Sequence, residues 1–208
     1  MSIYQNSHSS MFGDESNFSC PHICSGTNIA LVVDVSYIPN QDGDVVNSVT
    51  YNGSGLSFEG KAQQGIDMVQ EVWLMTGPDL GENNVEVNFS GTTKALINSV
   101  SYVGIKQEDP VFKQRTGVGK MVNTLPIKSF SKVSGISIGI GSTDDEESYV
   151  TSLSPVQNEE YRTIASGLSI CSQSISAQLP VTLNEISVEN TLTKPADWAI
   201  VIIGLDGV

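Results

Sequence analysis

Apolar and polar residues alternate with a period of two along most of this chain, which predicts β-strands. In VEVNFS, residues 85–90, three apolar residues alternate with three polar ones, so we expect the two sets on opposite faces of one strand. Residues 28–38, NIALVVDVSYI, form a near-continuous apolar run, which predicts a central strand covered on both faces. Residues 158–166 also fit a helix, but the run Tyr-Arg-Thr-Ile is β-prone, and we interpret the segment as a strand.

Turn residues separate these segments. Asn52-Gly53 is the strongest short hairpin signal, and Gly77-Pro78-Asp79 ends another apolar run. Further strands are expected at residues 45–51, 55–63, 68–76, 84–89, 94–105, 122–130, 135–140, 160–167, 168–179 and 197–205. About twelve β segments at this regular spacing are typical of an all-β fold, a two-sheet antiparallel sandwich.

The ends of the pattern define the expected domain organisation. Residues 1–16 are polar with scattered apolar side chains, which predicts a flexible N-terminal arm. Residues 107–119 are predicted to form a long polar loop, with strands of one style on both sides. Since no linker divides the rest, we expect residues 17–208 to form a single β-sandwich domain.

Charge narrows the classes of partner. The chain has ten Lys and Arg residues and 23 Asp and Glu residues, which give a formal net charge of -13. This negative charge disfavours binding to nucleic acid.

No apolar run approaches the roughly 20 residues that cross a bilayer. The first 16 residues lack the basic and apolar regions of a secretory signal, and three cysteines make no disulfide framework. Synthesis in the cytoplasm is the expectation.

Two motifs match catalytic patterns only by their letters. GISIG at residues 135–139 fits G-x-S-x-G, but the flanks alternate as a strand, and the histidines, His8 and His22, both precede it. GVGK at residues 117–120 hints at a phosphate loop, but Met121 stands where Ser or Thr is required. We interpret the first as a strand and the second as a flexible loop.

Cys20, His22 and Cys24 are the sharpest candidates for a metal site. At i, i+2 and i+4 they share one face of a strand. Neighbours on that face stand about 7 Å apart, too far for one tetrahedral zinc ion without a bend. We interpret the two thiols as buried free cysteines. A zinc site completed by His8 or Cys171, and a disulfide to Cys171, stay open as alternatives.

The remaining candidates also favour structural roles. The acidic stretches at residues 144–147 and 42–44 lack the spacing of a calcium loop and are expected to be solvated. Nothing in the sequence places two carboxylates at the separation that glycoside cleavage needs. Trp73 and Trp198 lie in apolar strands, which favours core packing, whereas Phe112 and Tyr149 are the candidates for sugar stacking. We therefore predict no catalytic, cofactor-binding or metal-binding residue.

Five segments occur in an order that resembles a known family. They are TNIALVVDVSY, SVTYNGSGLSF, VQEVWLMTGPDLGENNVEVNFSG, SVSYVGIKQEDPV and DWAIVIIGL. Together they are similar to a family of β-sandwich proteins found among phage virion proteins and bacterial secreted or surface proteins. The resemblance implies a jelly-roll-like sandwich that serves as a structural or adhesive module, and it carries no catalytic residues.

The expected function is that of a non-enzymatic phage structural protein. It would be a capsid decoration (cement) protein or a tail, fibre or collar component, made in the host cytoplasm and located in the virion. Its partners would be capsid or other virion proteins and further copies of itself, contacted through loops, sheet edges and the arm at residues 1–16. A carbohydrate-binding or adhesive surface module, with a glycan as its partner, is the alternative.

Overall fold

The computed structural model describes residues 3–40, 43–65, 68–131, 134–144, 150–154, 158–165, 168–176 and 184–208. Thirteen β-strands and no helix occur in these ranges. All the strand pairs between them are antiparallel. The expectation of an antiparallel all-β chain is therefore confirmed.

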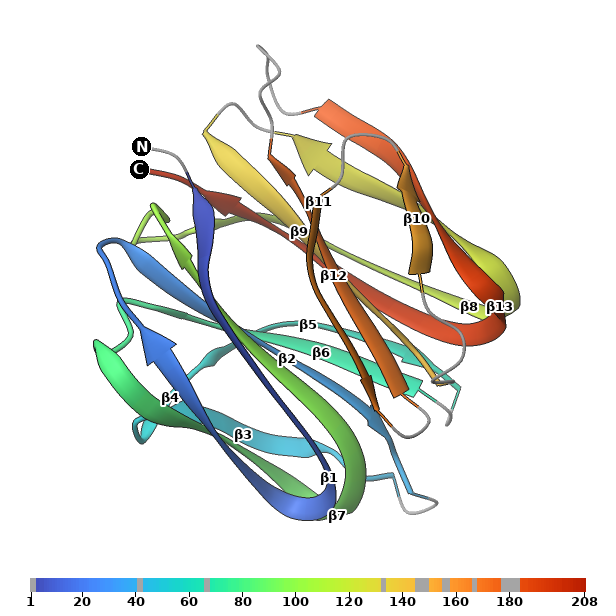
Figure 1. Cartoon of the computed structure of the whole chain (residues 1–208), viewed down its shortest axis with the longest axis horizontal. Helices are drawn as coiled ribbons and strands as arrows, with labels where there is room; N and C mark the ends of the chain where they lie inside the picture. Colours follow the sequence, from blue (N-terminus) through green and yellow to red (C-terminus); the bar gives the residue numbers. More distant parts are fainter. Residues whose placement is uncertain are drawn as a thin grey trace.

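The strands form two sheets (Figure 1). The first contains β1 (Tyr4–Cys24), β2 (Ile29–Ile38), β3 (Val46–Tyr51), β4 (Ser54–Gly55), β5 (Ser57–Gln64), β6 (Met68–Thr76) and β7 (Gly81–Val103). Its order is β4-β3-β7-β2-β6-β5, with β1 also paired to β7. The second contains β8 (Val111–Ser131), β9 (Gly135–Thr143), β10 (Val150–Ser154), β11 (Asn158–Ala165), β12 (Leu168–Ser176) and β13 (Asn184–Asp206). Its order is β10-β13-β9-β12-β11, with β8 also paired to β13.

The two halves of the chain repeat one topology. The pairings of the first sheet become those of the second when each strand is replaced by its counterpart: β1, β2, β3, β5, β6 and β7 by β8, β9, β10, β11, β12 and β13, in that order. Only the two-residue β4 has no counterpart. Each half opens and closes with a long strand, and these two strands pair with each other as a curved ribbon, β1 with β7 and β8 with β13 (Figure 1).

The irregularities of the two sheets also coincide. The β1–β7 register breaks between the pairs Glu15–Thr93 and Asn17–Asn88. The β8–β13 register breaks in the same way, between Val122–Ala196 and Thr124–Thr191. The bulge between Val46 and Ser48 in β3 likewise recurs between Val150 and Ser152 in β10. Because bulges are specific features of a strand pair, these matches identify an internal repeat of about half the chain.

Two hydrophobic cores hold the fold together. One lies between the sheets and joins side chains of β2, β6 and β7 to side chains of β9 and β13. The other lies on the opposite face of the first sheet, which curls around it. Strand β2 contributes to both cores, with Val32 in the first and Val33 in the second. The prediction of a central strand covered on both faces is confirmed.

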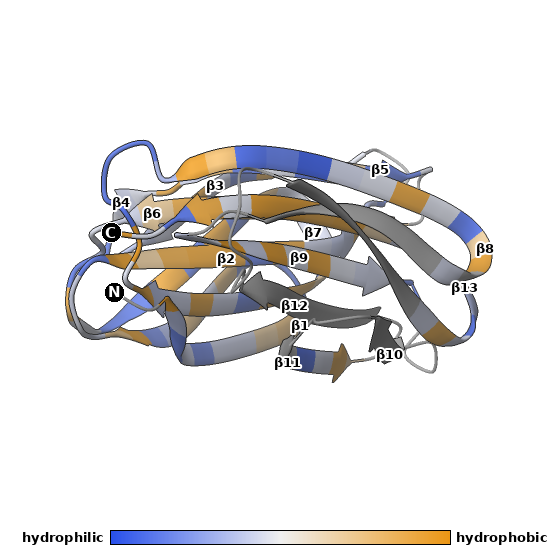
Figure 2. Cartoon of the chain, turned by 90° about the horizontal axis from the view of Figure 1, so that it is seen from above, coloured by the Kyte–Doolittle hydropathy of each residue, from blue (hydrophilic) through white to orange (hydrophobic). Residues whose placement is uncertain are grey.

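The distribution of hydropathy follows this arrangement. Hydrophobic residues are concentrated on the strands in the middle of the molecule, including β2 and β9 (Figure 2). The outer strand β8 carries a long hydrophilic stretch in the same view. Burial of the middle strands from both sides explains why their sequences are continuous apolar runs instead of alternating ones.

Two predicted irregular segments are strands instead. Residues 4–16, expected as a flexible arm, form the first part of β1 and pair with β7. Residues 111–119, expected in a polar loop, form the first part of β8. Each segment pairs with one strand only, β1 with β7 and β8 with β13, and polar side chains are usual on such edge strands, which are exposed to solvent. Two other segments are as predicted: β6 spans residues 68–76, and residues 158–165 form β11.

Candidate functional site

Cys20, His22 and Cys24 point into the curled first sheet, as their alternating positions predict. Their exposed fractions are 7%, 2% and 0%. The two cysteines are free thiols. No group of three metal-ligating side chains occurs among the described residues. The interpretation as buried free cysteines is confirmed, while the side chain of Cys171 lies outside the described residues.

His22 is held by serine hydroxyls from two other strand segments. Its Nδ1 lies 2.9 Å from Ser9 Oγ, and its Nε2 lies 3.1 Å from Ser7 Oγ and 2.8 Å from Ser101 Oγ. Cys24 Sγ also belongs to this hydrogen-bond network, since it lies 3.2 Å from Ser101 Oγ. A hydroxyl can donate or accept a hydrogen bond, so it satisfies both nitrogens of a neutral imidazole. Burial lowers the pKa of His22 to about 4, with a smaller contribution from His8.

This arrangement predicts that stability falls as the pH is lowered from 6.5 toward 4. Over that range an unfolded chain, in which the pKa of His22 is 6.5, binds a proton that the folded protein excludes. The free energy of unfolding should fall by about 3 kcal/mol from this residue. Urea unfolding at pH 7 and pH 4.5 measures the loss, which should be smaller in His22→Gln.

An NMR titration of the His22 imidazole in the unaltered protein tests the same prediction without a variant. A titration midpoint close to 6.5 would contradict it.

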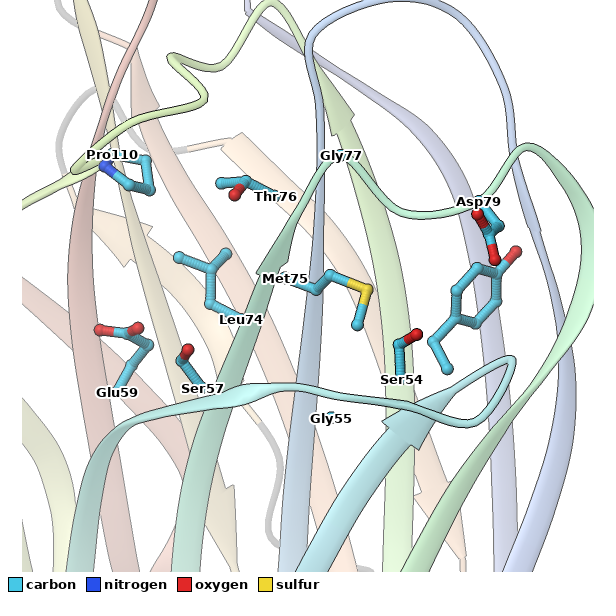
Figure 3. A pocket seen from close by; sticks show the side chains of 11 residues that line it. Ser54, Gly55, Ser57, Glu59, Leu74, Met75, Thr76, Gly77, Asp79 and Pro110 are labelled. Carbon is cyan, nitrogen blue, oxygen red and sulfur yellow. The ribbon is translucent and has the colours of Figure 1, made fainter.

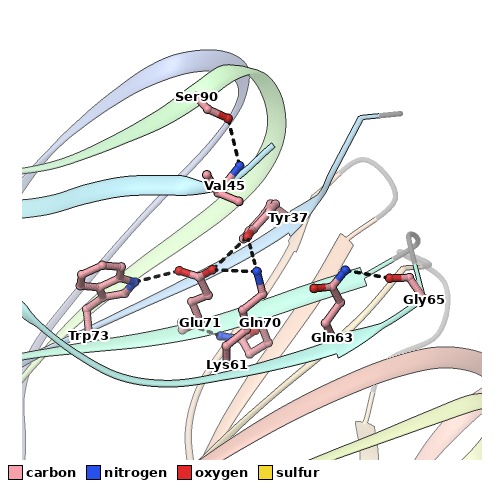
Figure 4. A network of polar contacts seen from close by, with 9 residues as sticks. All are labelled: Tyr37, Val45, Lys61, Gln63, Gly65, Gln70, Glu71, Trp73 and Ser90. Carbon is pink, nitrogen blue, oxygen red and sulfur yellow. Dashed lines mark hydrogen bonds and ion pairs between the residues drawn. The ribbon is translucent and has the colours of Figure 1, made fainter. Parts of the chain in front are cut away.

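A second buried network surrounds Glu71 of β6 (Figure 4). Its Oε1 accepts a hydrogen bond from the Tyr37 hydroxyl at 2.9 Å and lies 3.4 Å from Lys61 Nζ. Its Oε2 accepts from Trp73 Nε1 at 3.3 Å. Burial raises the pKa of Tyr37 well above its usual value, and the Glu71 charge adds to that effect. The carboxylate thus joins β2, β5 and β6 as a structural acceptor.

A third polar group lies in the core between the sheets. Asn98 donates to Asp34 Oδ1 at 3.2 Å, and its own Oδ1 accepts from Thr163 Oγ1 at 2.7 Å and lies 3.2 Å from His8 Nε2. Asp34 and Asn98 are fully buried, and Thr163 belongs to β11 of the second sheet. When the two halves are aligned on their matching bulges, the paired residues Asp34 and Asn98 correspond to the paired residues Ile140 and Val201 in the second half. One half therefore holds a polar pair where the other is apolar.

The remaining sequence candidates have structural positions. Ser137 of the GISIG motif is buried in β9, as its interpretation as a strand predicts. The GVGK segment belongs to β8, which corrects the expected flexible loop. Trp198 is buried as predicted, and Trp73 is half-buried with its ring against Phe58. Asp44 is buried rather than solvated, whereas residues 41, 42, 145–147 and Tyr149 lie outside the described residues.

A cavity of about 400 Å³ opens where the first sheet meets the start of β8 (Figure 3). It is lined by Tyr51, Ser54, Gly55, Ser57, Glu59, Leu74, Met75, Thr76, Gly77, Asp79 and Pro110. Sequence reasoning missed this site because its residues come from strand ends and turns that are far apart along the chain. The only local signals were the turn residues Gly77-Pro78-Asp79, which the pattern explained as a chain reversal.

Comparison with family models, with curated proteins and with solved structures finds no match to this chain. Among the described residues, no helix is long and apolar enough to cross a membrane.

Proposed function

We propose that this chain is a non-enzymatic structural protein of a virus particle, and that it attaches in many copies to the particle surface. Capsid decoration is the favoured role, and a tail, fibre or collar component is a variant of it. One observation supports it most: the most reactive buried side chains, His22, Cys24 and Glu71, serve as structural partners inside the first sheet. Among the described residues, the exposed surface includes carboxylates such as Glu86 and apolar side chains such as Leu80 and Phe12, a mixture that suits adhesion.

The proposed architecture is a jelly-roll-like sandwich. Two observations support it: the sheets share a core, and each half contains a curved ribbon of two long strands, β1–β7 or β8–β13 (Figure 1). The resemblance of five sequence segments to phage and surface β-sandwich proteins points the same way. A rigid double-layered body presents its edges at fixed positions, as a protein that binds a regular lattice requires.

Attachment would proceed through edges, turns and charge instead of through a free arm, because residues 4–16 belong to β1. Binding to the assembled lattice but not to free subunits would stabilise the lattice by mass action. The net charge of -13 would attract the chain to a basic surface on its partner. Screening at high salt should therefore weaken the attachment.

Particles purified on a density gradient from a culture that makes this protein provide the test. We expect quantitative mass spectrometry to find the chain in many copies per particle. A wash in 1 M NaCl, where the screening length is about 3 Å, should release more of it than a wash in 0.1 M, where that length is about 10 Å. Presence of the chain in the lysate together with its absence from the particles would refute the proposal.

A further inference from the structure

The long strands β1 and β8 each leave one edge of their ribbon without a β partner. Among the described residues, β1 pairs only with β7, and β8 pairs only with β13. The other edge of each strand therefore presents backbone N–H and C=O groups with which a further strand can pair. The two ribbons bend at separate places, at the bottom and at the right of Figure 1. Two different molecules can therefore contact the two edges at the same time.

The charges of these two edge strands are opposite. Strand β8 contains no acidic residue and four basic ones: Lys113, Arg115, Lys120 and Lys128. Strand β1 contains Asp14 and Glu15 but no lysine or arginine. Like charges oppose a contact between two β1 edges or two β8 edges, whereas opposite charges favour a contact between β1 and β8.

The opposite charges also occupy matching positions of the internal repeat. When the two halves are aligned on their matching bulges, Asp14 of β1 corresponds to Lys120 of β8, and Phe12 corresponds to Val118. All four side chains are exposed, Phe12 by 38% and Val118 by 46%. Each edge thus presents an apolar side chain that is followed two residues later by a charge, and the sign of that charge differs between the edges.

From this match we infer that the β1 edge of one molecule docks on the β8 edge of a second copy of this chain. Asp14 then faces Lys120, and Phe12 packs against the exposed apolar side chains of β8. Burial of these apolar groups and attraction between the charges provide the affinity. Because the two edges differ, the contact is heterologous, and it adds copy after copy to form a ring or a filament. This surface for self-association goes beyond the proposed attachment function and does not depend on it.

Sedimentation velocity of the purified full-length protein, from micromolar to millimolar concentration, tests the inference. We expect species larger than a dimer to accumulate in 0.1 M NaCl as the concentration rises. Fewer of them should form in 1 M NaCl, because the screening length falls from about 10 Å to about 3 Å. No particle is present in this experiment, so its result is separate from the test of attachment.

A charge swap locates the contact. Asp14→Lys and Lys120→Glu each place like charges on both edges, and each should weaken self-association about tenfold because attraction becomes repulsion. Combining both substitutions in one chain, or mixing the two single variants, makes the charges opposite again and should restore association. Glu86→Lys and Lys106→Glu are the matched controls, because they make the same changes in charge at exposed positions outside β1 and β8. They should leave association unchanged.

Thermal unfolding verifies that each variant is folded, and hydrogen–deuterium exchange provides a test without any variant. In the unaltered protein, amides of β1 and β8 should exchange more slowly at high than at low protein concentration. Titration with a fluorescent single-stranded oligonucleotide examines nucleic acid, the other partner of a basic edge, which the net charge of -13 disfavours.

Four results would overturn the inference. The protein stays monomeric at every concentration, or its association survives both single substitutions. The combined substitutions fail to restore an association that each of them abolished. The oligonucleotide binds to β8 in place of a second copy, and Lys120→Glu removes that binding.

Discussion

Deletion of residues 2–16 is expected to prevent folding, not simply to remove an appendage. These residues contain the first part of β1, which pairs with β7 from Thr93 to Val103. They also carry Ser7 and Ser9, which hydrogen-bond to the buried His22. Without them, one edge of β7 loses its backbone partners, and part of the core inside the first sheet becomes exposed. Circular dichroism and urea unfolding should show no cooperative transition, or one with a midpoint far below that of the full chain.

The matched control keeps the backbone of β1 and changes two exposed side chains, Ser10→Ala and Asp14→Asn. Surface changes of this kind usually alter stability by no more than about 0.5 kcal/mol. A shortened protein that unfolds with the midpoint of the full chain would contradict the role of β1. It would also restore the interpretation of this segment as an arm.

Replacement of Glu71 by alanine should cost about 3–5 kcal/mol of folding free energy, as the loss of one partner from a buried charged network does. The substitution leaves the Tyr37 hydroxyl and the Trp73 indole N–H without their acceptor and removes the ion pair of Lys61. Glu71 itself is 5% exposed, so water replaces the lost carboxylate poorly. Urea unfolding at neutral pH measures the difference from the unaltered protein.

Glu86→Ala provides the comparison for this experiment. It removes an exposed carboxylate from β7 with the same change in charge, and its effect should stay within about 0.5 kcal/mol. If both substitutions cost the same, the network around Glu71 does not carry the stability that we attribute to it.

Local pattern was a good guide wherever burial alone determines the strand. Residues 68–76 form an apolar run that ends at Gly77-Pro78, and β6 has these bounds. The inward positions of Cys20, His22 and Cys24 followed from alternation alone. Pattern failed in β1 and β8, where pairing of a polar backbone with a long partner defines the strand. Gly119 illustrates this: in β8 it packs against the Trp198 indole, which would clash with any side chain there.

Long-range features had no local signal. The residues that surround the cavity, including Glu59 and Asp79, are ordinary strand and turn residues in the sequence. The polar partners of His22 are serines from two other segments, one of them in β7. The repeated topology was also hidden, because the two halves conserve the positions of bulges and pairs but differ in the residues that occupy them.

Tethering the two halves in one polypeptide relaxes a rule that governs symmetric dimers. In a dimer of identical subunits, each amino-acid change appears on both sides of the interface. A buried carboxylate would then have to be accommodated twice, at a doubled desolvation cost. Here Asp34 and Asn98 occupy one side, while Ile140 and Val201 stay apolar on the other. Because the two halves are covalently linked, their sequences can differ, so one half carries a buried polar pair while the matching positions of the other stay apolar.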